Sequence, residues 1–172
     1  HPVVVTNDLT LTGTERIVVI SGPNQGGKTT MARVFGQVHF LAALGCPVPG
    51  AQAQVFLCDQ VLTVFEREEQ LDTLEGRLGA EIARLHEVFA EATARTVIVI
   101  NEAFASTALQ DARILTRDVL ERISELDAVA GCVTFIDELS RVNEKTVSMV
   151  STVDPSDPAV RTFRVERRVA DG

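Results

Sequence analysis

The amino-acid sequence predicts an α/β domain with a mostly parallel central sheet flanked by helices, and with antiparallel strands at the sheet edges. Three short runs of β-branched residues are apolar almost throughout, as expected for strands that are covered on both faces. Helical patterns lie between these runs, and alternation of strand and helix is typical of a parallel sheet. A glycine-rich stretch also follows the first run directly, as in a phosphate-binding loop.

The core elements follow in order along the chain. Strands are predicted at "RIVVIS" (16–21), "TVIVI" (96–100) and "GCVTFI" (131–136). Apolar residues three and four positions apart predict helices over 28–44, 78–94 and 108–127. Gly45 and Pro47 are expected to end the first helix, because glycine favours a helix C-terminus and proline cannot continue a helix.

Antiparallel or edge strands are predicted from segments that alternate apolar with polar residues. Such alternation is typical of strands with one solvated face. The segments are "VVVTNDLTL" (3–11), "TVSMVSTV" (146–153) and "VRTFRVERR" (160–168), and "DPSDPAV" (154–160) is predicted to be the turn between the last two. The charged stretch 66–76 is expected to be exposed.

Composition limits the classes of protein. A length of 172 residues fits one domain over 1–172, and without an initiator Met we expect it to be part of a longer protein. No apolar run approaches the roughly 18 residues that cross a bilayer. The three cysteines show no CxxC spacing and are expected to be small buried apolar side chains in a cytoplasmic protein. The net charge of −8 argues against binding of DNA by this segment alone.

The stretch "GPNQGGKTT" matches the pattern G-x-x-x-x-G-K-[ST] of a phosphate-binding loop. Consecutive backbone N–H groups of such a loop surround a polyphosphate, and the following helix adds the positive end of its dipole. Lys28 is expected to neutralise the β- and γ-phosphates, and the hydroxyl of Thr29 to ligate Mg²⁺. The predicted nucleotide-binding residues are Gly22, Pro23, Asn24, Gln25, Gly26, Gly27, Lys28, Thr29 and Thr30.

A second motif follows the strand 96–100. Asn101 and Glu102 stand where a nucleotide hydrolase needs an acidic residue beside the metal ion and a group that orients the attacking water. Glu102 and Lys28 are therefore the predicted catalytic residues. Asn101 can accept a hydrogen bond from a metal-bound water but brings no negative charge, so we expect ATP binding with slow or partner-dependent hydrolysis.

These motifs resemble the MutS family of DNA mismatch-repair ATPases, whose loop reads Gly-Pro-Asn-x-Gly-Gly-Lys-Ser/Thr. Further similarity lies in "LGCPVPGAQAQVFLCDQVLT", in "FAEATARTVIVINEAFASTALQDA" and in "VTFIDEL". Asn7 and Asp8, ahead of the first strand, resemble the family's short N-terminal segment near the adenine, which adds Asn7 to the expected nucleotide-binding residues. The resemblance covers nearly the whole chain. It implies a P-loop NTPase fold of the ABC-ATPase type and a head-to-tail homodimer in which each domain closes over the other's nucleotide.

The sequence departs from the family pattern at three places. Asn101 replaces the metal-shell aspartate, Phe135 stands in place of the switch histidine, and the signature Ser-Thr falls near Gly76-Arg77. The candidates for contacts across the dimer are Gly76, Arg77, Gly79 and Thr107, with Arg77 either a cation for the partner's phosphate or a solvated loop arginine.

The function expected from these residues is that of an ATP-binding and hydrolysing domain of a MutS-like DNA-processing protein, with ATP and Mg²⁺ as cofactors. Nucleotide-driven homodimerisation would control DNA-binding parts outside this chain, and no membrane is involved. The alternative is an ATP-dependent dimerisation switch with little hydrolysis. A transporter ATPase subunit should show an LSGGQ-like signature, which is lacking, and the acidic stretch 66–75 is a poor match for the arginine-rich lid of a small-molecule kinase.

Overall fold

The computed structural model describes residues 4–65 and 74–168 of the chain. Three α-helices and six strands make up the fold, and a short 3₁₀ helix, η1, follows β4. The elements in chain order are β1 (Ile17–Ser21), α1 (Lys28–Ala43), β2 (Val61–Phe65), α2 (Leu74–Glu91), β3 (Val97–Asn101), α3 (Leu109–Leu126), β4 (Val129–Val133), η1 (Asp137–Arg141), β5 (Thr146–Asp154) and β6 (Asp157–Arg167).

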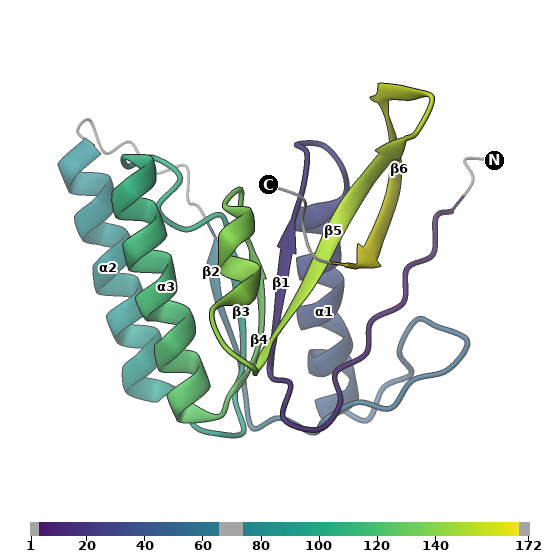
Figure 1. Cartoon of the computed structure of the whole chain (residues 1–172). Coiled ribbons are helices and arrows are strands. Elements are labelled where there is room, and N and C mark those ends of the chain that lie inside the picture. The colour runs from purple at the N-terminus through teal and green to yellow at the C-terminus, as the bar shows by residue number, and fades with distance from the viewer. Residues whose placement is uncertain (1–3, 66–73, 169–172) are drawn as a thin grey trace.

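The six strands form one mixed sheet in the order β2-β3-β4-β1-β5-β6 (Figure 1). Every neighbouring pair from β2 to β5 is parallel, and only β6 runs antiparallel, to β5. All five residues of β1 are buried, which agrees with its interior position in the sheet and with the four apolar residues Ile17–Ile20 that precede Ser21. β6 is mostly exposed, as befits an edge strand.

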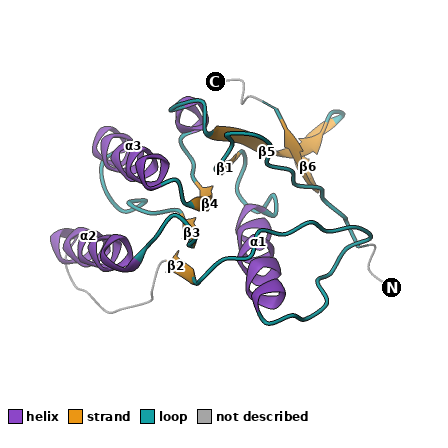
Figure 2. Cartoon of the chain, turned by 90° about the horizontal axis from the view of Figure 1, so that it is seen from below, coloured by secondary structure: helices purple, strands orange, loops and turns teal. Residues whose placement is uncertain are grey.

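Helices cover the two faces of the sheet unequally. Figure 2 shows α2 and α3 on one side of the sheet, with α1 and the long connection to β2 on the other. Side chains of β1 alternate between the two cores: Ile17 and Val19 pack with α2 and α3, and Val18 and Ile20 pack with α1. Gly131 of β4 makes room for Phe35 of α1, since a Cβ there would lie 2.9 Å from the phenyl ring. This two-sided packing holds β1 rigidly at the centre.

Because these strands run parallel, segments that are far apart in the sequence lie at one edge of the sheet, the edge where the strands end. The carboxyl ends of the parallel strands meet there, so the glycine-rich loop after β1, the turn after β3 and the start of η1 after β4 lie at the same edge. In open α/β sheets this is the edge at which ligands bind.

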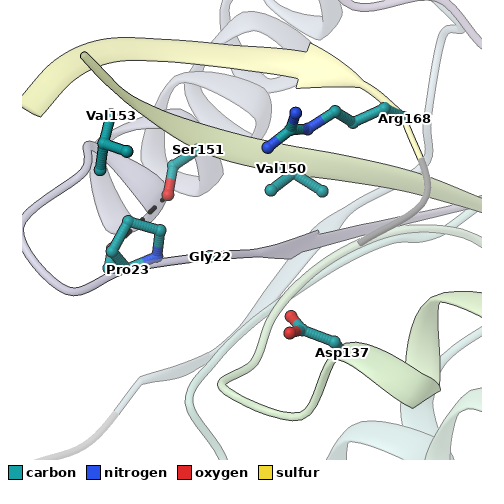
Figure 3. A pocket seen from close by; sticks show the side chains of 7 residues that line it. All are labelled: Gly22, Pro23, Asp137, Val150, Ser151, Val153 and Arg168. Carbon is teal, nitrogen blue, oxygen red and sulfur yellow. Dashed lines mark hydrogen bonds between the residues drawn. The ribbon is translucent and has the colours of Figure 1, made fainter. Parts of the chain in front are cut away.

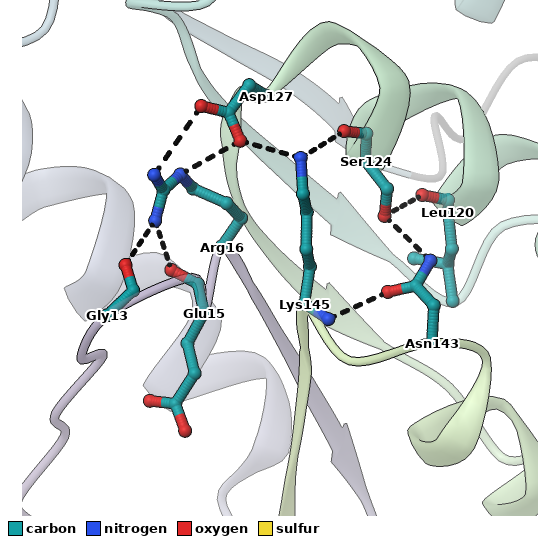
Figure 4. Close-up of polar contacts among 8 residues, drawn as sticks. All are labelled: Gly13, Glu15, Arg16, Leu120, Ser124, Asp127, Asn143 and Lys145. Atoms are coloured by element: carbon teal, nitrogen blue, oxygen red, sulfur yellow. Dashed lines mark hydrogen bonds and ion pairs between the residues drawn. The ribbon is translucent and has the colours of Figure 1, made fainter.

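A network of charged and polar side chains ties the strand starts together at the opposite edge (Figure 4). Asp127, directly after α3, accepts a hydrogen bond from Lys145 Nζ at 2.7 Å and pairs with Arg16 Nε at 3.2 Å. Lys145 also donates to the carbonyl of Ser124, and Ser124 accepts a hydrogen bond from Asn143. These contacts join α3 to the segments that lead into β1 and β5.

Several predictions about the edges are wrong. Residues 4–11 form no strand, and Asn7 contacts β6 through its side chain, which bonds to the backbone of Phe163 and Val165. β5 and β6 pair antiparallel, as predicted for these two segments, and β6 is an edge strand, but β5 is an interior strand that also pairs parallel with β1. β2, which was not predicted as a strand, is the parallel edge. β6 begins at Asp157, so the turn is shorter than the predicted 154–160.

The ABC-ATPase type of fold, with antiparallel strands at its edges, is corrected as well. The described chain is a small mixed α/β sheet of six strands with three helices, with one parallel and one antiparallel edge. The physical reason is that a loop motif specifies the backbone around its own glycines, whereas the strands that join a sheet are chosen by packing over the whole chain.

Other features of the sequence find a place in the fold. α1 ends as expected, with Gly45 at a φ of +72° after the helix. Cys58 and Cys132 are buried, whereas Cys46 is exposed, contrary to the expectation. The charged stretch 66–76 lies largely outside the described residues. Within the described chain, no helix is long and apolar enough to cross a membrane.

Candidate nucleotide-binding loop

The loop between β1 and α1 adopts a backbone that only glycine-rich sequences reach readily. Gly22, Gln25 and Gly27 have φ values of +104°, +61° and +92°. These left-handed conformations turn the chain sharply around the space above β1. Gly27 is the N-cap of α1, with no hydrogen bond from a side chain to the helix and no acidic residue in the first turn. The first N–H groups of α1 and the positive end of its dipole are therefore without a capping side chain, as an anion site requires.

Two glycines of the loop are needed because β5 lies directly beneath it. A Cβ on Gly22 would lie 2.7 Å from the backbone oxygen of Ser151, and one on Gly26 would lie 2.6 Å from the hydroxyl of the same residue. Ser151 Oγ in turn donates a long hydrogen bond of 3.5 Å to the carbonyl of Pro23. The loop can follow this path only with hydrogen atoms at positions 22 and 26.

Lys28 is held inside the loop. Its side chain is 3% exposed, and its Nζ donates to Gly22 O at 2.7 Å and to Asn24 Oδ1 at 3.2 Å. Glu102 Oε1 lies 3.8 Å from the same nitrogen. Burial lowers the pKa of Lys28, and the carboxylates of Glu102 and Asp137 partly offset that effect. A buried ammonium with so few counter-charges is suited to meeting an incoming polyanion.

The predicted pair after β3 reaches the same place. Asn101 is the last residue of β3, and Glu102 follows with a φ of +52°. The N–H of Glu102 donates to Val133 O at 2.9 Å. Phe104, with a φ of +63°, is 1% exposed and anchors the turn in the core. A positive φ at a non-glycine residue costs about 1 kcal/mol. Packing of Phe104 in the core offsets this cost and stabilises a turn that directs Glu102 toward Lys28.

Buried polar atoms without partners gather beside the loop. Ser21 Oγ and Asn101 Oδ1, at the last residues of β1 and β3, are buried and make no hydrogen bond within the described chain; Ser148 Oγ of β5 is the third such atom. Buried polar atoms normally have a hydrogen-bond partner. The unpaired Ser21 Oγ and Asn101 Oδ1 are therefore consistent with waters or a hydrated cation between the ends of β1 and β3. In residues 4–65 and 74–168, no group of three or more His, Cys, Asp or Glu side chains could hold a metal ion. The residues therefore fit Mg²⁺ only as a hydrated ion carried mainly by phosphate oxygens.

The remaining predicted residues lie as follows. Thr29 is half-buried in the first turn of α1, and Thr30, Asn24 and Gln25 are exposed. Asn7 does not face the loop with a free amide, because its Nδ2 donates to Phe163 O at 3.1 Å and its Oδ1 accepts from Val165 N at 2.7 Å. It holds β6 in place instead.

The candidates for contacts across a dimer do not cluster with the loop. Gly76, Arg77 and Gly79 are exposed in the first turns of α2, the helix that packs beside the outermost strand β2. Thr107 is half-buried in the turn before α3, where its N–H donates to Phe104 O. These four residues lie at the same edge of the sheet as the loop, where the parallel strands end, but they belong to different elements.

Sequence reasoning missed the residues that approach the loop from η1 and from the β5–β6 hairpin. A cavity of about 290 Å³ lies beside the start of the loop (Figure 3). It is lined by Gly22, Pro23, Asp137, Val150, Ser151, Val153 and Arg168. In addition, Arg161 Nε of β6 donates to Asn24 O at 2.9 Å. No local pattern signals these contacts, because 128 and 137 positions separate Ser151 and Arg161 from their partners in the loop.

Comparison with known proteins adds an independent finding. A family model described as MutS domain V matches residues 18–170. The chain is 29% identical to "DNA mismatch repair protein MutS" of Shouchella clausii, over 99% of this chain and 21% of that protein. It is 32% identical to "DNA mismatch repair protein MutS 2" of Halobacterium salinarum, over 78% of this chain and 16% of that protein. The chain thus spans about a fifth or less of the length of these relatives.

The comparison bears on two expectations. The resemblance to the MutS family is confirmed, since the matched segment covers nearly all of the chain. The ABC-ATPase type of fold is not retained, because the match is to the small domain V and the structure is a six-stranded mixed sheet with three helices.

Proposed function

We propose, on the premise that this chain belongs to the family of MutS domain V, that it binds ATP with Mg²⁺ at the loop 22–30 and hydrolyses it. The observation that carries the proposal is the loop itself. A buried lysine, a helix N-terminus without a side-chain cap and three positive-φ residues occur together within residues 22–28, at the edge of the sheet where the parallel strands end.

Each residue has a distinct role in this proposal. The backbone N–H groups after Gly22 and the ammonium of Lys28 bind the phosphates. Thr29 and a water on Asn101 would hold Mg²⁺, which supplies charge neutralisation at the phosphate oxygens. The carboxylate of Glu102 accepts the proton of the attacking water, since it lies at the strand end beside Lys28. Lys28 then offsets the negative charge that develops on the transferred phosphoryl group.

For the longer protein, we propose only how nucleotide binding at this domain would act on the other parts. The relatives are named as DNA mismatch repair proteins and are about five times longer than this chain. We propose that nucleotide binding favours a homodimer, which biases DNA-binding parts outside the 172 residues. A net charge of −8 supports placing the DNA contacts elsewhere.

Phosphate release from the purified chain with ATP and Mg²⁺ tests the enzymatic part. Glu102→Gln should lower the rate by about 10²-fold or more, because it removes a proton acceptor, while leaving ATP binding intact. Glu121→Gln, which removes an exposed carboxylate on α3, serves as the matched control and should leave the rate unchanged. Equal rates for the protein with and without Glu102→Gln would refute the role of that residue.

A second candidate function is an ATP-dependent dimerisation switch with little turnover. The observation that favours it is Asn101, whose buried Oδ1 lacks both a charge and a hydrogen-bond partner within the described chain. In that case light scattering should report dimers with ATP while phosphate release stays at background. Asn101→Asp should then tighten Mg²⁺ binding and raise the rate, because a carboxylate attracts the hydrated cation. Unchanged dependence on Mg²⁺ concentration would count against this account of Asn101.

A further inference from the structure

The β5–β6 hairpin lies against the phosphate-binding loop at several points. Ser151 of β5 fills the space that Gly22 and Gly26 leave open. On β6, the backbone oxygen of Phe163 would lie 3.8 Å from a Cβ at Gly27. The N-terminal residue Asn7 fixes this part of β6 by bonding to Phe163 O and Val165 N. An edge strand thus meets a loop that lies far from it in the sequence.

Arg161 makes the direct polar contact between hairpin and loop. Its Nε donates to Asn24 O at 2.9 Å, and its Nη1 donates to Pro158 O at 2.7 Å. The side chain is half-buried and held at two points, so its guanidinium is ordered before any ligand arrives. Hydrogen bonds from a charged donor are about twice as strong as those between neutral groups.

Holding the carbonyl of Asn24 determines the direction of the next peptide group. The described chain contains no cis peptide bond, so the C=O of Asn24 and the N–H of Gln25 point in opposite directions. With the carbonyl turned to Arg161, the N–H of Gln25 is turned away from β6. Lys28 Nζ holds the side-chain oxygen of the same Asn24 at 3.2 Å. Two cations therefore fix one loop residue by its main-chain and side-chain oxygens.

The charge of Arg161 also acts on the site of Lys28. Burial is the main cause of the lowered pKa of Lys28, Glu102 and Asp137 raise it, and Arg161 lowers it further. Two cations close enough to repel each other are both stabilised by a polyanion placed between or beside them.

We propose that Arg161 is a positioning residue of the phosphate site, and that the β5–β6 hairpin belongs to this site because Arg161 orients the loop at Asn24 and adds a second positive charge beside Lys28. The inference rests on the proposed nucleotide binding at this loop. It predicts that nucleoside di- and triphosphates bind the chain more tightly because of a residue outside the loop motif.

Titration of a fluorescent ADP analogue with Mg²⁺ into the chain tests the proposal. Arg161→Gln should weaken binding about tenfold, the effect of losing one charge-assisted contact. Arg161→Lys keeps the charge without the Nε–H that holds Asn24 and should regain part of the loss. Arg164→Gln removes a charge from an exposed position on the same strand and should leave the affinity within about twofold of the starting value.

The melting temperature without nucleotide separates positioning from a merely structural role. It should change by no more than about 3 °C in Arg161→Gln, since the side chain is only half-buried. Equal affinities for Arg161→Gln and the unsubstituted chain would overturn this inference and leave the proposed function standing. A loss of affinity matched by a large drop in melting temperature, with no recovery in Arg161→Lys, would also overturn it. Absence of nucleotide binding by the unsubstituted chain would overturn the proposed function and this inference together.

Discussion

At the scale of single residues, the candidate site depends on groups held where their isolated chemistry disfavours them. Lys28 is a charged side chain buried in the loop, and Glu102 is a non-glycine residue with a positive φ. Asn101 leaves a buried oxygen without a partner within the described residues. Each arrangement lowers the free energy of unfolding of the unliganded chain. Contacts between these groups and a bound nucleotide would offset that loss.

Lys28 gives a prediction about stability in the absence of nucleotide. Because burial lowers its pKa in the folded state, the folded chain binds this proton less tightly than the unfolded chain. The linked stability is therefore lowest where both states are protonated and increases as the pH rises through the folded-state pKa. Replacing the charge should relieve the cost at neutral pH, so Lys28→Met should raise the melting temperature.

The same variant should lose the thermal shift that ATP and Mg²⁺ produce. Differential scanning fluorimetry with and without nucleotide measures both effects, and Arg164→Met on the exposed edge strand is the control. A lower melting temperature for Lys28→Met would mean that its bonds to Gly22 and Asn24 outweigh the cost of burial.

At the scale of elements, the loop is defined as much by β5 as by its own sequence. The backbone of Gly26 has no positive φ, yet a Cβ there would lie 2.6 Å from Ser151 Oγ and 3.0 Å from Pro23 O. The glycine is therefore needed for close approach and not for conformation. This distinction makes the packing between loop and strand testable by substitution.

Gly26→Ala should destabilise the chain by about 1–3 kcal/mol, the usual cost of forcing a methyl group into packed space. Ser151→Gly should recover part of that loss in the double variant, because it removes both of the β5 atoms that the new Cβ would meet. Chemical denaturation of the single and double variants measures the coupling.

Gly79→Ala is the matched control for these variants. Apart from its chain neighbours and the backbone of its own helix, no atom of the described residues lies within 4 Å of a Cβ at position 79 in α2, so alanine there should stabilise the helix by about 0.5–1 kcal/mol. Strictly additive effects of Gly26→Ala and Ser151→Gly would contradict the packing argument.

At the scale of the whole molecule, the edge of the sheet where the parallel strands end and the edge where they begin carry different groups. The carboxyl edge carries the loop with its strained and unpaired groups, whereas the opposite edge carries the network of Arg16, Asp127 and Lys145 (Figure 4). That network joins segments more than 100 positions apart, since 111 positions separate Arg16 from Asp127. We interpret it as stabilisation placed away from the site.

Asp127 gives a pH-dependent prediction. Its hydrogen bond from Lys145 is the main reason that its pKa lies below the ordinary value, with Arg16 adding to the effect. A lowered carboxyl pKa contributes stability above the unfolded-state pKa, and that stability is lost as the pH falls through the folded-state pKa. Asp127→Asn should therefore lower the melting temperature at about pH 7, with the difference shrinking as the pH falls below the ordinary carboxyl pKa of about 3.9 and through the folded-state pKa.

The substitution is suited to this test because Asp127 has a φ of +59°, which asparagine also tolerates. Melting curves across the acid range measure the difference, and Glu121→Gln removes an exposed ion pair as the comparison. A difference that persists unchanged at the lowest pH would show that the carboxylate does not act through its charge.

The sequence by itself determined the local parts of this protein. Nearly continuous apolar runs predicted β1, β3 and β4 to within a few residues, because strands buried on both faces favour apolar side chains at successive positions. The glycines and Lys28 located the loop, because its backbone angles and buried ammonium are requirements of a few adjacent residues. The pair Asn101-Glu102 was found by the same reasoning, from its place at a strand end.

Only the tertiary structure decided the sheet edges and what surrounds the loop. Residues 4–11 alternate like a strand but form no ladder, whereas β2, whose sequence Val-Leu-Thr-Val-Phe suits a strand but was not predicted as one, pairs with β3, because pairing depends on which neighbour is available. Arg161 and Ser151 reach the loop from a hairpin more than 120 positions away. Such contacts follow from the packing of complete elements against each other, which no local pattern of residues contains.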